Sequence, residues 1–271
     1  MRSLAVTGNV SPPPQGAEWR RPPYSAVARI YDRLMRPVFT DRQRPLLDAL
    51  TAHLGLTPGA WADAACGTGT VACHLASRGW RVFGADISRD MLAVAGAKAT
   101  VLGVPTEFAI QDMRRLRTPF ACDVVSCFFD SLNILTRSAD LVRAFQAAAR
   151  CLKPGGYYVF DAVTPHQVRH LWKYCDSMHE GQGFFGAWQI LKHCAPNTTT
   201  VLMRWFIRDD NGMFYRADET HRVRGYSRRE IAGALQQAGL RLEAAYEGDE
   251  GFLAPVARTT MRIDYIARKP L

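Results

Sequence analysis

Residues 61–70 have the sequence Trp-Ala-Asp-Ala-Ala-Cys-Gly-Thr-Gly-Thr, which predicts the end of an apolar strand, a glycine turn and the start of a helix. The helix is expected over 71–78, with Thr70 as its cap. Gly67 and Gly69 carry no Cβ, so the backbone there can turn sharply and approach a ligand closely. Units of this kind present backbone N–H groups to nucleotide-like ligands in doubly wound α/β proteins.

The turn alone does not identify the ligand, because residues 67–72 also fit the dinucleotide-binding fingerprint. Acidic residues that follow the next strands add information. A predicted strand over 81–85 is followed by Asp86, about 20 residues after the glycines, where a carboxylate accepts hydrogen bonds from ribose hydroxyls. A third strand over 106–110 is followed by Asp112 and Met113.

The ordered motifs at 63–69 and 84–92 resemble the class I S-adenosylmethionine-dependent methyltransferases of the bacterial small-molecule type. The likeness is strongest over 60–160. It implies an α/β fold: a doubly wound, seven-stranded Rossmann-like sheet with the last strand antiparallel, and S-adenosyl-L-methionine as the cofactor. Ala64 and Ala65 stand where a larger apolar residue and a glycine are frequent in that family, although alanine at the second place is a familiar variant.

The resemblance also implies roles for single residues. Gly67 and Gly69 would approach the methionine part of the cofactor, Asp86 the ribose, and Asp112 with Met113 the adenine. Asp63 would support the loop and the cofactor's amino group. The complete set expected to contact the cofactor is Tyr31, Asp63, Ala65, Gly67, Gly69, Asp86, Ile87, Met91, Asp112, Met113 and Phe128.

Composition limits the class of protein. The chain has 271 residues, 48% of them apolar and 22% charged, which suits one large α/β domain with an insertion. The net charge of +9 permits nucleic-acid binding, but the arginines are scattered, so we do not favour it. No apolar run is long enough for a membrane span, and no secretory signal is recognised. The seven cysteines form no C-x-x-C pair, so we expect buried thiols, no metal site and a cytoplasmic protein.

The chain divides into a flexible N-terminal arm over 1–23, rich in proline and glycine, and a methyltransferase domain over 24–271. Outside the insertion, helices are expected over 24–39, 45–54, 88–102, 139–152 and 227–238, and further strands over 123–129, 157–161, 241–246 and 261–268. Ser88 and Ser227 are the expected first residues of two of these helices.

An antiparallel β insertion is expected over about 172–224. Alternating polarity predicts strands over 184–193, 199–208 and 213–223, and Asp-Asp-Asn-Gly at 209–212 predicts the hairpin turn between the last two. By resemblance the insertion forms a lid over the ligand edge of the sheet and shapes the acceptor pocket. The alternative is a dimerisation sheet, so a monomer and a homodimer both remain open.

Catalytic candidates lie on the third insertion strand. Glu219 and His221 are two residues apart and face the same side, and histidine can accept a proton near neutral pH. The alternative is a polar pair on the outer face of the insertion. For the methyl acceptor, the candidate contacts are Asp130, Asn133, Trp188 and Tyr215. The alternatives are a helix cap for Asp130 and Asn133 and insertion core for the aromatic residues, which include Trp172, Tyr174 and Trp205.

The function expected is transfer of a methyl group to nitrogen or oxygen of a small molecule by direct in-line displacement. Three alternatives remain: a methyltransferase of the tRNA wobble uridine, a nicotinamide-dependent oxidoreductase and a non-catalytic cofactor-binding protein. Asp112-Met113 and a reversed last strand disfavour the oxidoreductase. Glu219 and His221 disfavour the non-catalytic protein.

Overall fold

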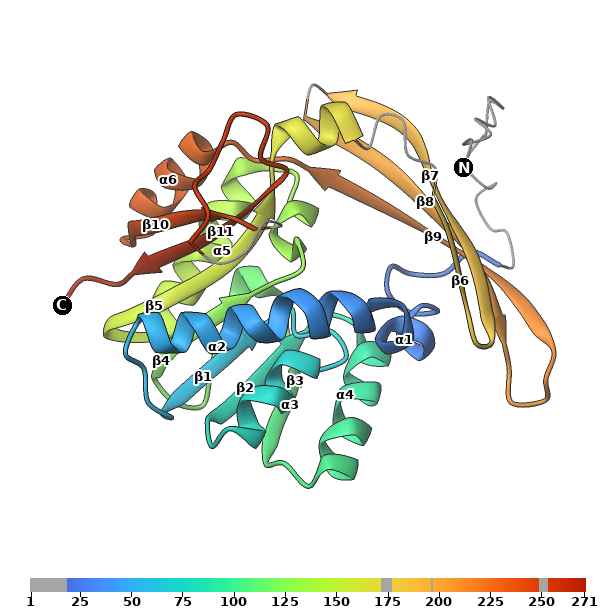
Figure 1. Ribbon diagram of the computed structural model, residues 1–271, viewed down its shortest axis with the longest axis horizontal. Coiled ribbons are helices and arrows are strands. Elements are labelled where there is room, and N and C mark those ends of the chain that lie inside the picture. Colours follow the sequence, from blue (N-terminus) through green and yellow to red (C-terminus); the bar gives the residue numbers. More distant parts are fainter. Residues whose placement is uncertain (1–18, 172–176, 196, 249–252) are drawn as a thin grey trace.

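The computed structural model of the protein describes residues 19–171, 177–195, 197–248 and 253–271, with side chains for all of them except 171 and 192–194. Two β-sheets dominate this part of the chain (Figure 1). The first is a seven-stranded sheet with helices on both faces. The second is a four-stranded antiparallel sheet that projects beyond one end of the first.

The seven-stranded sheet has the order β10-β11-β5-β4-β1-β2-β3. The bounds of these strands are β1 Ala60–Ala64, β2 Arg81–Asp86, β3 Thr106–Ile110, β4 Cys122–Cys127, β5 Leu152–Val163, β10 Arg241–Glu247 and β11 Arg262–Arg268. The first five strands run parallel, and β11 is antiparallel to both of its neighbours, as predicted for the last strand. The strand order reverses between β1 and β4, and ligands bind open α/β sheets at the carboxyl ends of the strands beside such a reversal.

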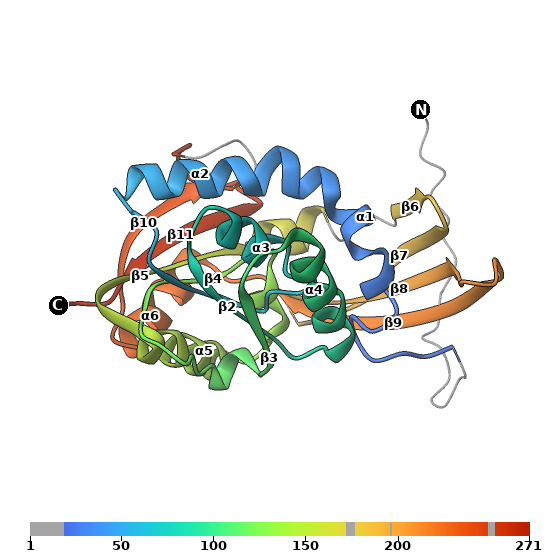
Figure 2. The ribbon, with the colours of Figure 1, turned by 90° about the horizontal axis from the view of Figure 1, so that it is seen from below.

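Helices cover both faces of this sheet (Figure 2). Their bounds are α1 Ala28–Val38, α2 Arg44–His53, α3 Thr70–Ser77, α4 Arg89–Leu102, α5 Ser138–Cys151 and α6 Arg228–Gln237. Helices α2 and α3 pack on one face, and α5 and α6 on the other. A π-helical turn over Phe39–Gln43 joins α1 and α2 into one rod. None of the helices in the described ranges is long and apolar enough to cross a membrane.

Helix caps agree with the sequence at two places and differ at a third. Ser88 caps α4 by accepting a hydrogen bond from Met91 N at 3.2 Å, and Ser227 forms a capping box with Glu230. Thr70 was expected to cap α3, but this prediction is wrong, because Gly69 occupies the cap and Thr70 is the first helical residue. The Thr70 hydroxyl is instead bonded to side chains of α1 and α4.

The four-stranded sheet, which we call the lid, consists of β6 Ser177–Gly181, β7 Phe184–Ala195, β8 Thr198–Arg208 and β9 Phe214–Arg224, in that order. The three predicted strands and the hairpin turn after Arg208 are present. Strand β6 was not predicted, because its sequence Ser-Met-His-Glu-Gly lacks apolar alternation. The predicted start of the insertion at residue 172 lies outside the described residues.

The segment before α1 is tied to the lid. Asp218 N donates to Trp19 O at 2.8 Å, and Arg21 N donates to Asp218 O at 2.9 Å, so Arg20 pairs in parallel with β9. The guanidinium of Arg216 lies over the Trp19 ring at 4.7 Å. Residues 1–18 of the predicted arm lie outside the described residues, whereas Trp19 and Arg21, within the predicted arm, make backbone hydrogen bonds to β9.

Candidate functional site

The glycine turn after β1 places three successive residues of the expected site in the left-handed region. Ala65 has φ 56°, Gly67 has φ 53° and Gly69 has φ 71°. Glycine adopts this conformation freely, whereas an alanine there costs about 1–2 kcal/mol. A Cβ at Gly67 would meet no atom within 4 Å, so this position opens into the space where a ligand can approach the backbone.

Gly69 has a different reason to be glycine. A Cβ there would lie 2.8 Å from Ala95 Cβ and 2.9 Å from Phe108 Cζ, which is closer than packed atoms come. The neighbouring strand residue Gly84 also touches the Phe108 ring, with a Cβ position 2.6 Å from its edge. Gly69 therefore permits close packing of α3, α4 and β3 and lines neither of the cavities described next, contrary to its predicted cofactor contact.

Two adjoining cavities lie along the carboxyl ends of β1, β2 and β3. The first, of about 490 Å³, includes Asp86, Ile87, Met91, Asp112 and Met113 in its wall. The second, of about 350 Å³, includes Asp63, Thr68, Lys98 and Phe128. Both cavities touch Tyr31, Ala65, Gly67, Phe129 and Ser131. Ten of the eleven residues expected to contact the cofactor thus line one elongated space, which we call the cofactor cavities.

Asp86 joins the end of β2 to the glycine turn. Its Oδ2 accepts from Gly67 N at 2.8 Å and its Oδ1 accepts from Ser88 N at 2.8 Å. Burial raises the pKa of Asp86, and the N–H groups of Ser88 and Gly67 act against that rise. Each carboxylate oxygen has a second lone pair, so both can still accept a hydrogen bond from a hydroxyl of a ligand.

Asp63 lies at the end of β1 and is buried. Its Oδ1 accepts from Ser126 Oγ at 2.7 Å, and Ser126 Oγ in turn accepts from Trp61 Nε1 at 2.8 Å. Burial raises the pKa of Asp63 to about 7. A cationic amino group in the neighbouring cavity would favour the ionised form of this carboxyl.

An ion pair holds the wall of the first cofactor cavity at Asp112, where the adenine is expected. Asp112 Oδ1 accepts from Arg114 N at 2.9 Å, and both of its oxygens contact the Arg114 guanidinium, so hydrogen bonding from Arg114 lowers the pKa of Asp112. The side chain of Ile87 is 68% exposed on the same cavity. An apolar side chain in that position offers a flat purine a surface to cover. The fit of these residues to an adenosyl group is therefore good at both the base and the ribose.

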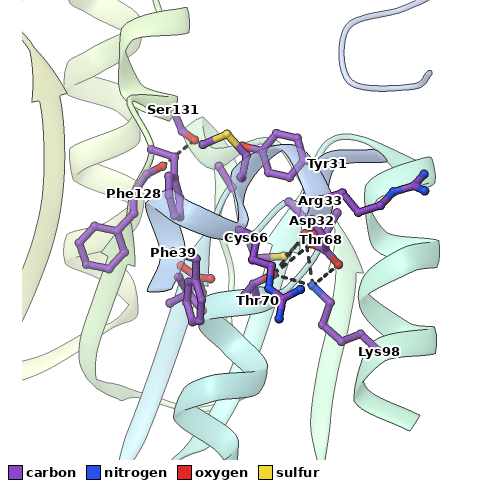
Figure 3. A pocket seen from close by; sticks show the side chains of 17 residues that line it. Tyr31, Asp32, Arg33, Phe39, Cys66, Thr68, Thr70, Lys98, Phe128 and Ser131 are labelled. Carbon is purple, nitrogen blue, oxygen red and sulfur yellow. Dashed lines mark hydrogen bonds and ion pairs between the residues drawn. The ribbon is translucent and has the colours of Figure 1, made fainter. Parts of the chain in front are cut away.

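Helix α1 is fastened across the second cofactor cavity by a polar cluster (Figure 3). Asp32 Oδ2 forms an ion pair with Lys98 Nζ at 2.7 Å, and its Oδ1 accepts from Thr68 Oγ1 at 2.6 Å. Lys98 Nζ also donates to Thr70 Oγ1 at 2.5 Å. This cluster joins α1, the glycine turn and α4, and the sequence analysis did not predict it.

A third cavity of about 240 Å³, which we call the lid cavity, lies between the lid, α1 and the end of β4. It shares Tyr31 and Phe129 with the cofactor cavities. Its wall consists of Tyr24, Val27, Tyr31, Leu34, Met35, Phe129, Asp130, Ile134, Ser177, Trp188, Ile190, Val201, Met203, His221 and Val223. A ligand in the lid cavity would therefore lie beside a ligand in the cofactor cavities.

Asp130 reaches the lid cavity from a strained turn after β4. Phe129 and Asp130 have φ of 59° and 50°, and strain of this kind collects at ligand sites. Asp130 N donates to Asp161 Oδ1 at 2.9 Å, and Asp130 Oδ1 accepts from Arg262 Nη1 at 2.9 Å. The turn is thus fixed from β5 and β11, and its carboxylate is held at the cavity wall, where it was predicted to meet the acceptor.

The two catalytic candidates on β9 have different surroundings. His221 lines the lid cavity, and its ring meets the Tyr24 ring edge-on at 4.7 Å. Glu219 is completely buried and lines none of the three cavities. It accepts backbone N–H groups from Tyr24 at 2.8 Å, Ala26 at 2.9 Å and Val27 at 3.2 Å, and His221 Nε2 lies 3.2 Å from its Oε2. Glu219 holds the segment that leads into α1, and a direct catalytic role does not fit this position.

Two of the four predicted acceptor contacts also lie elsewhere. The Asn133 amide donates to Arg224 O at 2.6 Å and Val163 O at 3.1 Å and accepts from Val163 N at 3.0 Å, so it ties β9 to β5. Tyr215 packs in the core between the lid and α1, as does Trp205. Trp188 does line the lid cavity. Trp172 and Tyr174 lie outside the described residues.

Tyr24 is a site residue that the sequence analysis did not select. It has φ 63°, and its carbonyl accepts from Ser88 Oγ at 3.3 Å. Its side chain lines both the lid cavity and the larger cofactor cavity. Helical spacing could not have selected it, because the helix expected over 24–39 begins only at Ala28 and Tyr24 lies before it with a left-handed backbone.

Residues 62–156 match the methyltransferase domain family. A protein of Geobacillus sp. (strain WCH70) that carries the name of a methyltransferase is 30% identical over 251 residues, which cover 91% of this chain and 99% of that protein. The structure of an S-adenosylmethionine-dependent methyltransferase from Clostridium acetobutylicum ATCC 824 has a TM-score of 0.80 at 25% identity and covers 92% of this chain and 99% of its own.

A more distant relative is the dTDP-3-amino-3,6-dideoxy-alpha-D-glucopyranose N,N-dimethyltransferase of Streptomyces fradiae. It is 25% identical over 236 residues, which cover 83% of this chain and 88% of that protein.

Proposed function

Because the chain belongs to the class I S-adenosylmethionine-dependent methyltransferases, we propose that it methylates a nitrogen or oxygen atom of a small molecule bound in the lid cavity. The observation that carries this proposal is the pair Tyr31 and Phe129, which belong to the walls of both the cofactor cavities and the lid cavity. S-adenosylmethionine supplies a methyl carbon on a sulfonium, and in the transfer the acceptor atom bonds to that carbon while the C–S electron pair goes to sulfur.

The protein's part in such a displacement is alignment and proton removal. Asp86, Asp63 and Gly67 hold the cofactor from the sheet side. On the lid side, His221 lines the lid cavity, and we assign to it the removal of a proton from the acceptor. When Nε2 of a neutral His221 donates to Glu219, Nδ1 is the basic nitrogen of the ring.

The enclosed position of the lid cavity favours a small molecule over tRNA as the methyl acceptor. The lid cavity is enclosed by the lid, α1 and the turn at Asp130, and the relative from Streptomyces fradiae acts on a dTDP-linked amino sugar by its name. Phosphate contacts make nucleic-acid binding strongly dependent on salt. Titration with unmodified tRNA between low and high salt should therefore show only weak binding with no acceptance of a methyl group.

The first experiment is calorimetric titration of the protein with S-adenosylmethionine, S-adenosylhomocysteine and NADH. We expect the two adenosyl compounds to bind and NADH to fail. Binding of NADH alone would favour the oxidoreductase, and binding of the adenosyl compounds without turnover on any acceptor would favour a cofactor-binding protein. Acceptors are then found by transfer of a labelled methyl group to a panel of amines and alcohols.

The role of His221 is tested by His221→Asn with the acceptor found in this way. Loss of a general base lowers kcat by about 100-fold or more. Cofactor affinity should stay unchanged, because His221 does not line the cofactor cavities. His53→Asn is the matched control: this histidine is the last residue of α2, meets Tyr246 edge-on and lines none of the three cavities. An unchanged kcat in His221→Asn would exclude proton transfer by His221.

A further inference from the structure

The charge in the lid cavity contrasts with that of the whole chain. The protein carries 34 lysines and arginines and a net charge of +9. Nevertheless, no lysine or arginine is among the described residues that line the lid cavity, and its wall contains the carboxylate of Asp130. A phosphate or carboxylate of an acceptor would find no cationic partner there. A cation would find a carboxylate.

Asp130 is arranged to bind a group in the cavity. Its Oδ1 is engaged by Arg262 Nη1 at 2.9 Å, and its side chain remains 29% exposed. Within the described part of the chain, Oδ2 makes no hydrogen bond. The backbone bond to Asp161 holds the turn, so the carboxylate is oriented before any ligand arrives.

Arg262 does not cancel the charge of Asp130, because it is shared. The Arg262 guanidinium also pairs with buried Asp161, and Arg42 Nη2 lies 2.8 Å from Asp264 Oδ1 and 3.9 Å from Asp161 Oδ2. Among the described residues this cluster contains three carboxyl groups and two guanidinium groups, and Asp130 is its member at the lid cavity. Burial raises the pKa of Asp264 to about 7, so these five groups together carry one negative charge when Asp264 is ionised and no net charge when it is protonated.

Aromatic side chains supply the remaining recognition for a cation. Tyr24, Tyr31, Phe129 and Trp188 come from the segment before α1, from α1, from the turn after β4 and from β7, and all four line the lid cavity. The faces of aromatic rings carry partial negative charge and attract ammonium groups. A carboxylate with several aromatic walls is a chemical arrangement that binds alkylammonium ions.

We propose that the methyl acceptor is an amine that enters the lid cavity as an ammonium ion and is oriented by the Asp130 carboxylate and the aromatic walls. This inference rests on the proposed function and narrows its acceptor from nitrogen or oxygen to an amine nitrogen. A primary ammonium loses one proton to the neutral His221 ring before it attacks. The product nitrogen keeps its two remaining protons, gains the methyl group and leaves as a secondary ammonium ion.

The test uses the full chain saturated with S-adenosylhomocysteine, so that no turnover occurs. Calorimetric titrations compare three probes that share a cyclohexyl ring: cyclohexylammonium, cyclohexanol and cyclohexanecarboxylate. We expect cyclohexylammonium to bind about 10- to 100-fold more tightly than cyclohexanol, because a hydrogen bond to a charged group contributes about 1.5–3 kcal/mol. The carboxylate should bind most weakly. Equal or tighter binding of the alcohol or the carboxylate overturns the inference.

A pair of variants locates the preference. Asp130→Asn keeps the size of the side chain, and asparagine tolerates the left-handed backbone. The substitution should reduce the ratio of the affinity for cyclohexylammonium to that for cyclohexanol to about one. Asp140→Asn is the control: Asp140 lies on α5, pairs with Arg143 and Arg114 and lines none of the three cavities. It should leave the ratio unchanged. A preference for ammonium that survives in a folded Asp130→Asn protein overturns the role of Asp130.

The titration with S-adenosylhomocysteine distinguishes a failure of the proposed function from a failure of the amine inference. A protein that binds S-adenosylhomocysteine but shows no preference for ammonium keeps its proposed function and loses the amine inference. A folded protein that does not bind S-adenosylhomocysteine at all loses both. The comparison of the three probes on the unaltered protein needs no substitution, so it stands even if a variant fails to fold.

Discussion

Asp86 and Glu219 make nearly the same kind of contact in two different sheets. Asp86 lies at the end of β2 and accepts N–H groups from Gly67 and Ser88, and Glu219 lies within β9 and accepts N–H groups from Tyr24, Ala26 and Val27. Asp86 lines a cofactor cavity, whereas Glu219 lines none of the three cavities. Hydrogen bonds from the backbone to a carboxylate therefore do not by themselves indicate a ligand site. A carboxylate that also lines a cavity, as Asp86 does, is the better candidate.

The comparison predicts that substitution of Glu219 affects folding more than substitution of Asp86. Glu219→Ala leaves two buried N–H groups and a partly buried one without their acceptor and His221 without its partner, so we expect a loss of about 3–5 kcal/mol in the free energy of unfolding. Denaturation by urea measures this loss. The control is Glu243→Ala, which removes a carboxylate paired with Arg241 near the surface and should cost about 1 kcal/mol or less. Similar losses in the two variants would contradict the anchoring role of Glu219.

For cofactor affinity we expect the opposite order, with substitution of Asp86 having a larger effect than substitution of Glu219. Asp86→Ala should weaken binding of S-adenosylmethionine by about 30- to 100-fold, because it removes the carboxylate that we propose as the acceptor for the ribose hydroxyls. Calorimetric titration measures the change. Asp123→Ala is the matched control at the opposite edge of the sheet, where Asp123 Oδ2 accepts from Ala60 N at 2.8 Å. If Asp123→Ala weakened cofactor binding as much as Asp86→Ala does, the assignment of the cofactor site to the carboxyl ends of the strands would be wrong.

The same contrast explains how far the sequence could be interpreted. Around the glycine turn, contacts are made by residues close in the chain, such as Asp86 and Gly67, and the motif identifies them directly. In the lid, alternation predicted the strands and the common face of Glu219 and His221. It did not show what this face meets, because Tyr24 N and Glu219 are 195 residues apart in sequence. Asp130 and Arg262, 132 residues apart, were beyond local patterns for the same reason.

Small residues and amides were also ambiguous in the sequence. Gly67 and Gly69 belong to one motif, yet one faces a cavity and the other packs against Phe108. Asn133 follows β4 as a ligand-binding residue would, but all of its amide groups bond to the backbone of β5 and β9. Only the positions of distant strands decide between these possibilities.

Asp63, in the wall of a cofactor cavity, should make the stability of the protein depend on pH. The folded carboxyl has a pKa of about 7, above its ordinary value of 3.8, so the folded state holds one more proton than the unfolded state between those values. Stability should therefore fall as pH rises through this window, by up to about 1.4 kcal/mol per pH unit. Asp264 also has a pKa raised to about 7 and contributes to the same window. The difference in slope between the unaltered protein and Asp63→Asn isolates Asp63, and identical slopes would show that its carboxyl titrates normally.

The smallest expected effect concerns Ala65, which lines both cofactor cavities with φ 56°. Ala65→Gly removes the strain of a left-handed alanine but gives the unfolded chain more freedom, so the net gain in stability is at most about 1 kcal/mol. Gly67→Ala is the mirror experiment at φ 53°, where no neighbouring atom within 4 Å opposes the added methyl group. Gly67→Ala should lower the free energy of unfolding by about 1 kcal/mol through the same backbone strain. It should also weaken cofactor binding, because the added methyl group projects into open space at the cavity wall. If Gly67→Ala lost stability without any loss of cofactor affinity, the turn would need glycine for its conformation alone, and the approach of a ligand to this backbone would have no support.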